Sequence, residues 1–254
     1  MSLLNQMVDV VCPPACLLCH QPLDRGAGDD RAIGRAMCDP CVRAMPAITL
    51  PWCQRCGLSL DGPYDAALLC RACRTSQPIY AQAVAVWQYR GMVPHAIRQF
   101  KYHHRRRIGQ WLGDAMAEAA CQRLPIREID GLVPVPLHWW KRRLRGCNPS
   151  ALLAHALGTA LEKPVLEHAV SRKRWTRSQT GLSSTQRWRN VQHAFTAHPT
   201  AVRRAAILLV DDVLTSGATV SACAQALRDG GARAVYVLTA ARTLSPHAER
   251  RGSA

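Results

Sequence analysis

The sequence lacks any stretch of about 18 or more uncharged apolar residues, the usual minimum for a membrane-spanning helix. Its first 16 residues, MSLLNQMVDVVCPPAC, also lack the basic segment and long apolar run of a secretory signal peptide. These two absences predict a cytoplasmic protein without membrane insertion. The 254 residues are 48% hydrophobic, so the chain can form one large domain, or a medium domain beside a small one.

Acidic residues are scarce, with 17 Asp and Glu against 33 Lys and Arg. The imbalance is confined to one part of the chain. The first 80 residues hold seven acidic and seven basic residues, so residues 81–254 carry the whole formal net charge of +16. A basic segment of this size favours anionic partners such as nucleic acid or phosphorylated metabolites.

Large apolar residues are few between residues 12 and 75, so this segment cannot bury a sufficient core without metal. It contains four C-x-x-C pairs instead, and two such pairs complete a tetrahedral zinc site. A disulfide framework is disfavoured because no secretory signal is present. We therefore predict a double zinc-ribbon domain over residues 1–80 with two structural zinc sites. The predicted ligands are Cys16, Cys19, Cys38, Cys41, Cys53, Cys56, Cys70 and Cys73.

Two ligand assignments are compatible with the spacing of the pairs. A sequential arrangement uses the first and second pairs for one zinc ion and the third and fourth for the other. It is favoured because MPAITLP (45–51) is typical of a linker between two units. A cross-braced arrangement, in which the first pair joins the third, stays open. Cys223 belongs to no pair and is expected to pack on a buried helix face.

From residue 81 onward, strand and helix patterns alternate. Strands are predicted over 81–90, 130–137, 207–211 and 234–242, and helices over 91–124, 148–162 and 218–229. Gly109 is expected at a break in the first helical stretch, and Asn148 is expected to cap the second. Such apolar strands connected by helices predict a parallel sheet with helices on both faces. Residues 81–254 are thus expected to form an α/β domain.

The stretch ILLVDDVLTSGATV (207–220) combines a buried strand, two adjacent aspartates and a loop that leads into a helix. It is not a P-loop, because G-x-x-x-x-G-K-[ST] is absent. The backbone N–H groups at the helix start can bind a phosphate. Asp211 and Asp212 would repel a bare phosphate, but they can accept hydrogen bonds from the hydroxyls of a phosphorylated sugar. A metal site or a solvated turn is the alternative. The hydroxyls available to the phosphate are those of Thr215, Ser216 and Thr219.

This stretch resembles the phosphoribosyl pyrophosphate (PRPP) loop of type I phosphoribosyltransferases. In that loop the aspartates hold the ribose 2′- and 3′-hydroxyls and the following residues bind the 5′-phosphate. The cysteine-rich head, FKYHHRR (100–106), VPVPLHWWKRRLRGCNPS (133–150) and TRSQTGLSSTQRWRNVQHAF (176–195) also follow the order of the ComF family, also called GntX-like. The resemblance covers nearly the whole chain. That family is associated with competence, the uptake of DNA in natural transformation.

The resemblance implies a type I phosphoribosyltransferase-like domain whose aspartate pair binds PRPP or a related ribose phosphate. VPVP (133–136) is similar to the loop on the pyrophosphate side. Cys147-Asn148-Pro149 departs from the more usual Phe-Asn-Gln, which leaves the start of the following helix in question. The implied 5′-phosphate contacts are Thr215, Ser216, Gly217, Ala218 and Thr219. A mobile segment over the site is implied for Thr176, Gln179, Leu182, Arg187 and Asn190.

The reaction implied by such a site is displacement of pyrophosphate from the anomeric carbon of ribose. Mg²⁺ and basic side chains stabilise the leaving group. The candidate cations are Lys101, the arginines of 105–107 and Arg187. No pocket for a nucleobase acceptor can be recognised in the sequence. A catalytically active phosphoribosyltransferase, in nucleotide or sugar-acid metabolism, therefore stays open as an alternative function.

Tryptophans lie among the cations of HWWKRRLR (138–145), RKRWTR (172–177) and QRWRN (186–190). Cations that follow phosphates and aromatic rings that stack on bases are typical of single-stranded DNA binding. The alternative is that the tryptophans pack on the sheet and the cations are solvated. The resemblance, taken with these basic and aromatic stretches, implies a competence-associated, ComF-type protein with a PRPP site. It would support uptake or processing of single-stranded DNA, with competence or DNA-processing proteins as candidate partners.

Overall fold

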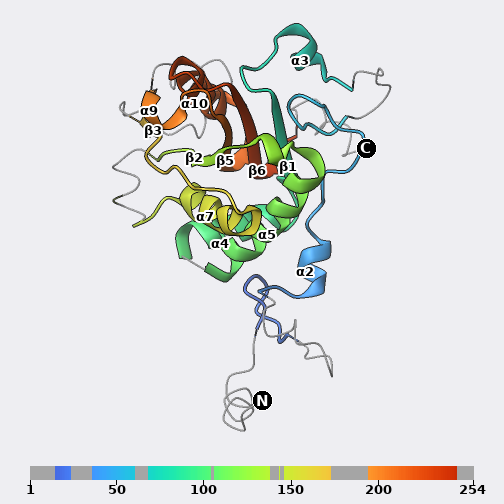
Figure 1. The fold of residues 1–254 in the computed structure, drawn as a ribbon. Helices are drawn as coiled ribbons and strands as arrows, with labels where there is room; N and C mark the ends of the chain where they lie inside the picture. The colour runs from blue at the N-terminus through green and yellow to red at the C-terminus, as the bar shows by residue number, and fades with distance from the viewer. Residues whose placement is uncertain are drawn as a thin grey trace.

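A four-stranded parallel sheet forms the centre of the protein (Figure 1). The computed structural model describes residues 15–23, 36–60, 68–103, 106–137, 143, 146–172 and 194–244. The strand order is β1-β6-β5-β2. The strands are β1 (Gln82–Gln88), β2 (Gly131–Pro134), β5 (Ala206–Leu214) and β6 (Ala234–Arg242). All three pairings are parallel, as the alternation of strands and helices predicts.

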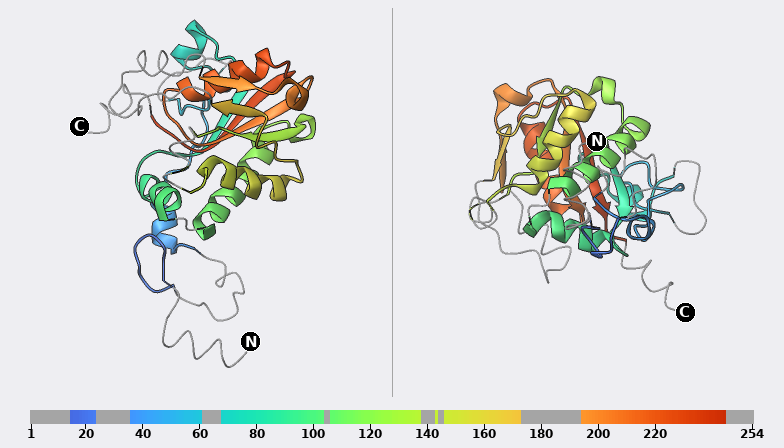
Figure 2. Two further views of the ribbon diagram at one scale, coloured as in Figure 1. Left: turned by 90° about the vertical axis from the view of Figure 1, so that its left-hand side faces the viewer. Right: turned by 90° about the horizontal axis from the view of Figure 1, so that it is seen from below.

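Helices cover both faces of the sheet (Figures 1 and 2). One face packs against α4 (Val93–His103), α5 (Arg106–Arg123) and α7 (Pro149–Leu161). The other packs against α10 (Ala218–Asp229) and the antiparallel pair β3 (Val170–Arg172) and β4 (Phe195–Ala197). Within β5, Leu208 belongs to the first core and Leu209 to the second, because successive side chains point to opposite faces. Two short elements, η2 (Ile126–Glu128) and α9 (Pro199–Val202), lie in the connections before β2 and β5. The predicted α/β fold is confirmed.

The start of α7 agrees with the sequence. Asn148 is the N-cap, its side chain accepts a hydrogen bond from the Ser150 backbone N–H at 3.3 Å, and Pro149 occupies the first turn. The Asn148 side chain also donates to the Val135 carbonyl at 3.1 Å. Although Cys147-Asn148-Pro149 differs from the more usual Phe-Asn-Gln, the N-terminus of α7 is still capped. None of the described helices is long and apolar enough to cross a membrane.

The expected break at Gly109 is wrong, because Gly109 lies inside α5. A Cβ atom at Gly109 would lie 2.6 Å from Cε2 of Phe100 in α4. The glycine therefore permits the close packing of α4 on α5 rather than a change of direction. Strand β5 also runs to Leu214, beyond the expected end at residue 211, because β6 continues beside it. Asp211 and Asp212 consequently lie within the strand.

The cysteine-rich segment contains two short helices, α2 (Asp39–Arg43) and α3 (Arg71–Thr75), which lie toward opposite ends of the molecule (Figures 1 and 2). The residues between them pair with the edge strand β1. The Ile48 N–H donates to the Val86 carbonyl at 2.8 Å, and the Gln88 N–H donates to the Pro46 carbonyl at 2.9 Å. The linker between the two ribbon units thus contacts the α/β domain directly. The domain boundary at residue 80 remains a prediction.

Arg123 of α5 fixes this contact from the side of the α/β domain. Its guanidinium carbon lies 4.0 Å from the centre of the Trp52 ring, and its Nη2 donates to the Ile48 carbonyl at 2.9 Å. A cation over an aromatic face is attractive, and more so when it is partly removed from water. The start of the second ribbon unit is therefore held against α5 as well as against β1.

Candidate functional site

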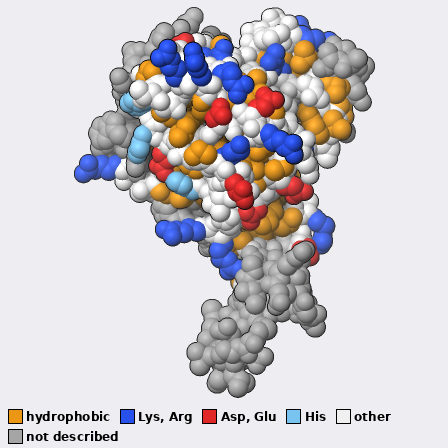
Figure 3. Space-filling view, viewed as in Figure 1, with side chains coloured by type: hydrophobic (Ala, Val, Ile, Leu, Met, Phe, Trp, Pro, Cys, Tyr) orange, Lys and Arg blue, Asp and Glu red, His pale blue; other side chains and the backbone are white. Residues whose placement is uncertain are grey.

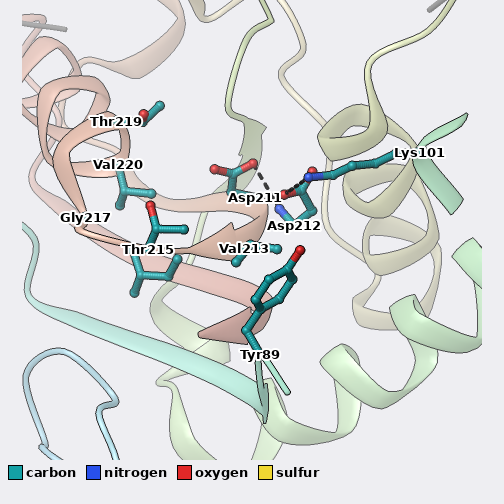
Figure 4. Close-up of a pocket in the computed structure, with 10 residues that line it drawn as sticks. Tyr89, Lys101, Asp211, Asp212, Val213, Thr215, Gly217, Thr219 and Val220 are labelled. Atoms are coloured by element: carbon teal, nitrogen blue, oxygen red, sulfur yellow. Dashed lines mark hydrogen bonds and ion pairs between the residues drawn. The ribbon is translucent and has the colours of Figure 1, made fainter. Parts of the chain in front are cut away.

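A cavity of about 460 Å³ opens at the carboxyl end of the sheet, where β1 and β5 finish (Figure 4). Ligands of open parallel sheets bind at this edge. The cavity brings together residues from α4, from the end of β5 and from the start of α10. The lining residues that the sequence predicted are Lys101, Asp211, Asp212, Thr215, Gly217 and Thr219.

The two aspartates have different partners. Asp211 Oδ1 accepts hydrogen bonds from Ser150 Oγ at 2.8 Å and from the Asp212 backbone N–H at 2.9 Å. Asp212 Oδ1 forms an ion pair with Lys101 Nζ at 2.7 Å (Figure 4). The Lys101 and Asp212 side chains are 21% and 14% exposed, so this pair is only partly solvated. One of the two adjacent negative charges is therefore balanced within the protein.

Burial raises the pKa of Asp211 to about 7, and the neighbouring charge of Asp212 raises that pKa as well. Lys101 and the hydrogen bond from Ser150 lower it, but they do not offset the burial. Asp211 thus exchanges between carboxylate and carboxylic acid near neutral pH. A ligand that donates hydrogen bonds into the cavity would favour the carboxylate form.

The helix α10 points its N-terminus at the same cavity. Gly217, the N-cap residue, has a left-handed backbone with φ of 78°, which favours glycine, and as a glycine it has no side chain of its own to cap the helix. Thr215, Gly217 and Thr219 line the cavity on one side of the aspartates, and Lys101 lies on the other (Figure 4). A helix N-terminus beside hydroxyl groups is suited to a phosphate. Of the other predicted contacts, Ser216 is exposed and Ala218 is buried as the first residue of α10.

Several predicted residues fall elsewhere. Arg187, the rest of the predicted mobile segment and the four tryptophans among the cations lie outside the described residues, as does Arg105. Arg106 and Arg107 are exposed in the first turn of α5 and do not line the cavity. The predicted pyrophosphate-side loop begins as β2, and the Val135 N–H donates to the Val210 carbonyl at 2.9 Å, next to Asp211.

Among the polar residues of the site, Tyr89 and Ser150 were missed from the sequence. Tyr89 follows β1 and lines the cavity. Ser150 lies in the first turn of α7 and is buried against Asp211. The signal for Tyr89 was available, because β1 ends at the same sheet edge as β5. The signal for Ser150 was weak, since a serine at the start of a helix is also a common capping residue.

The eight cysteines of the C-x-x-C pairs form two clusters in sequential order, 16/19/38/41 and 53/56/70/73. The four sulfur atoms of each cluster lie within 4.8 Å of one another. The Cys19–Cys38 and Cys56–Cys70 Sγ distances are 3.5 and 3.7 Å. Zn–S bonds of about 2.3 Å in a tetrahedron place the sulfurs about 3.8 Å apart, so both clusters fit zinc.

Backbone donors support the first cluster, because the N–H groups of Leu18 and Cys38 both point at Cys16 Sγ at 3.4 Å. Zinc bound in these clusters would supply folding energy to segments with little apolar core. Cys223, in contrast, is fully buried in α10, and burial raises the pKa of its thiol. Its predicted packing role is consistent with this placement.

Comparison with known proteins gives a match to a family model and several similar sequences. Residues 7–75 match the family model described as a double zinc ribbon domain. DNA utilization protein YhgH of Escherichia coli K12 is 33% identical over 238 residues, covering 91% of this chain and 98% of that protein. Competence protein F of Haemophilus influenzae is 28% identical over 213 residues, covering 81% and 90%.

A solved structure with some similarity is the glutamine PRPP amidotransferase of B. subtilis. It has a TM-score of 0.36 and 23% identity, over 51% of this chain and 25% of that one. This overlap is too small for the properties of that enzyme to be transferred.

The central parallel sheet, its two helical layers and the cysteine clusters define an α/β domain preceded by a segment that matches a double zinc ribbon. The sequence identity of 33% with YhgH, over nearly the full length of both proteins, is enough to show the family. The chain belongs to the ComF/GntX family, whose members include YhgH and competence protein F.

Proposed function

We propose that the cavity binds a 5′-phosphorylated ribose, PRPP or a related ribose phosphate, and that the protein supports uptake or processing of single-stranded DNA in natural transformation. The observation that carries the first part is the position of Asp211 and Asp212 beside the glycine-started N-terminus of α10. The two groups offer acceptors for hydroxyls and donors for a phosphate within one cavity. A ribose 5-phosphate has both chemistries in one molecule.

The binding mode follows from the partners of each group. The start of α10, with Thr215 and Thr219, would hold the 5′-phosphate through N–H and hydroxyl donors. Asp211 and Asp212 would accept hydrogen bonds from the 2′- and 3′-hydroxyls. Lys101, on the opposite side of the aspartates, would face the anomeric end of the sugar, where PRPP carries its pyrophosphate. Mg²⁺, held by the pyrophosphate and the aspartates, would neutralise part of that charge.

The test is binding of PRPP and of ribose 5-phosphate, with Mg²⁺, measured by isothermal titration calorimetry. The double variant Asp211→Asn/Asp212→Asn keeps the side-chain size and removes both charges. Since hydrogen bonds to charged groups contribute about 1.5–3 kcal/mol each, we expect at least a 100-fold loss of affinity. Asp229→Asn, which changes an exposed aspartate at the end of α10, is the matched control and should bind normally. Unchanged binding by the double variant would refute the assignment of the cavity.

The proposed role in DNA handling is supported by the names of the relatives and by the basic surface. Lys and Arg side chains gather over the end of the molecule that carries α9 and α10 (Figure 3). The turns before β5 and β6 are joined there by the Arg204 N–H to Gly231 carbonyl bond at 2.8 Å. These turns lie at the amino end of the sheet, opposite the cavity. The exposed arginines of this edge are Arg203, Arg204, Arg228 and Arg233.

Binding of a labelled single-stranded oligonucleotide, followed by fluorescence anisotropy at several salt concentrations, tests this part. Arg203→Gln/Arg204→Gln should weaken binding about tenfold and make it less salt-dependent, because each lost phosphate contact removes about 0.7 from the salt slope. The Asp211→Asn/Asp212→Asn variant should keep its DNA affinity. No binding of the wild type to single-stranded DNA would refute the proposed role in DNA handling.

A catalytic phosphoribosyltransferase in nucleotide or sugar-acid metabolism is the second candidate. It is favoured by one observation, the placement of Lys101 in the cavity, where a cation can stabilise departing pyrophosphate. Incubation with PRPP, Mg²⁺ and a set of nucleobases and oligonucleotides should then release pyrophosphate. Release that Asp211→Asn/Asp212→Asn abolishes would establish this activity, and its absence for every acceptor would favour a binding role.

A further inference from the structure

Arg242, the last residue of β6, lies between two strands whose ends form the cavity. Its carbonyl oxygen accepts a hydrogen bond from the Tyr89 backbone N–H at 2.7 Å. In the sheet it is paired with Leu214 at the end of β5 on the other side. Both Tyr89 and Leu214 line the cavity. The backbone of Arg242 therefore holds two residues of the cavity wall without lining the cavity itself.

The side chain of Arg242 reaches the second cysteine cluster. Its Nη2 donates to Cys56 Sγ at 3.6 Å, which joins residues 186 positions apart in the sequence. The other guanidinium nitrogens, Nε and Nη1, are buried and have no hydrogen-bond partner among the described residues. A buried guanidinium without partners is costly unless negative charge lies close to it.

The second cluster supplies such charge when it holds metal. Four thiolates around one Zn²⁺ carry a net charge of −2, and all four cysteines of this cluster are buried. Metal-bound thiolates are commonly stabilised by N–H donors from outside the ligand set. The first cluster has two backbone donors on Cys16, and the second has a side-chain nitrogen, that of Arg242, on Cys56.

We propose that Arg242 is the charge partner of the second zinc site and couples that site to the ribose-phosphate cavity. Zinc-bound thiolates fix the guanidinium, and the backbone of the same residue fixes Tyr89 and Leu214. Ligand in the cavity then slows zinc loss, and loss of zinc weakens ligand binding, since coupling between two sites is reciprocal. The coupling rests on the proposed function of the cavity, but the charge-partner role does not.

The charge-partner role is tested by zinc release to a chromogenic chelator from the full-length, zinc-loaded protein. A Cys19→Ser background removes a ligand of the first cluster, so that the second zinc is the one measured. Arg242→Gln should release this zinc at least about tenfold faster, as expected for loss of an outer donor. Arg242→Lys, which keeps the charge but not the forked geometry, should be intermediate.

Arg55→Gln is the matched control, because Arg55 lies in the same ribbon but donates to the Ala81 carbonyl and to Gln77 rather than to sulfur. It should release zinc at nearly the wild-type rate. Circular dichroism before chelation confirms that each variant is folded. All rates are compared in the Cys19→Ser background. If Arg242→Gln releases zinc no faster than the protein with Arg242, or no faster than Arg55→Gln, Arg242 is not the charge partner of the second zinc site.

The coupling is tested by repeating zinc release with saturating ribose 5-phosphate. Release from the protein with Arg242 should slow severalfold, and release from Arg242→Gln should not change. A ligand effect of the same size in both proteins would overturn the coupling. If the protein with Arg242 does not bind ribose 5-phosphate at all, the proposed function and the coupling both fail, while the release rates without ligand still decide the charge-partner role.

Discussion

Replacing Lys101 with Met should show how much the Lys101 charge stabilises the two adjacent carboxylates of Asp211 and Asp212. Lys101 Nζ lies 2.7 Å from Asp212 Oδ1, and the two side chains are 21% and 14% exposed. Exposed ion pairs contribute about 0.2–1 kcal/mol, and removing one partner from a buried pair costs about 3–5 kcal/mol. For this partly buried pair we expect the free energy of unfolding to fall by about 2 kcal/mol at pH 8.5, where Asp211 is mostly ionised in the wild type.

The loss should depend on pH in a definite direction. The pKa of Asp211 in the folded protein, about 7, already lies above its ordinary value, and loss of the Lys101 charge raises it further. The folded variant then holds more protons than the unfolded chain from about pH 4 upward, so its stability falls as pH rises through this range. At pH 6, where Asp211 is mostly protonated, the loss should shrink to about 1 kcal/mol.

Urea unfolding of the zinc-loaded protein at both pH values measures these losses. Lys163→Met is the matched control, because Lys163 lies beyond the far end of α7 from Ser150. It should cost little at either pH. Adding Asp212→Asn to Lys101→Met should restore much of the stability, since it removes the unbalanced charge. A loss that is the same at pH 6 and pH 8.5 would refute this reasoning about the acidic pair.

Two further substitutions probe the surroundings of the site. Ser150→Ala removes a hydrogen bond that lowers the pKa of Asp211, so binding of ribose 5-phosphate, followed by calorimetry from pH 6 to 9, should reach half its maximum at a higher pH than in the wild type. An unmoved midpoint would contradict the role given to the Asp211 carboxylate. Gly109→Ala places a Cβ atom 2.6 Å from Phe100, and overpacking of this kind should lower the stability by about 1–3 kcal/mol in thermal unfolding. An unchanged stability of Gly109→Ala would mean that α4 can move away from α5 at little cost.

The sequence predicts the local elements well where physical signals are strong. The limits of β6 and α10 were expected at the residues where the structure has them, because apolar runs end there in Gly-Gly or in charged residues. The capped start of α7 was likewise visible in Asn148-Pro149. The end of β5 was misplaced because two aspartates usually mark the limit of a buried strand. Only the partner strand β6, which continues beside them, extends the pairing to Leu214.

The site was predictable in part for a related reason. The aspartates and the phosphate-binding turn are adjacent in sequence, so one stretch predicts both. Their partners come from distant segments: Lys101 lies 111 residues from Asp212, and Ser150 lies 61 residues from Asp211. A local pattern carries no information about contacts at such separations. The neighbourhood of Arg242 and Cys56 was hidden for the same reason.

The pairing of residues 46–48 with β1 affects how the newly synthesised chain folds. An uncovered edge strand of a sheet offers its N–H and C=O groups to any other strand that it meets. Here the connection between the two cysteine clusters covers that edge, through Pro46 and Ile48. If both clusters need zinc to fold, then the pairing of Pro46 and Ile48 with β1 also depends on zinc. We therefore expect zinc-starved chains to associate with one another through β1, so that metal supply limits the yield of correctly folded protein.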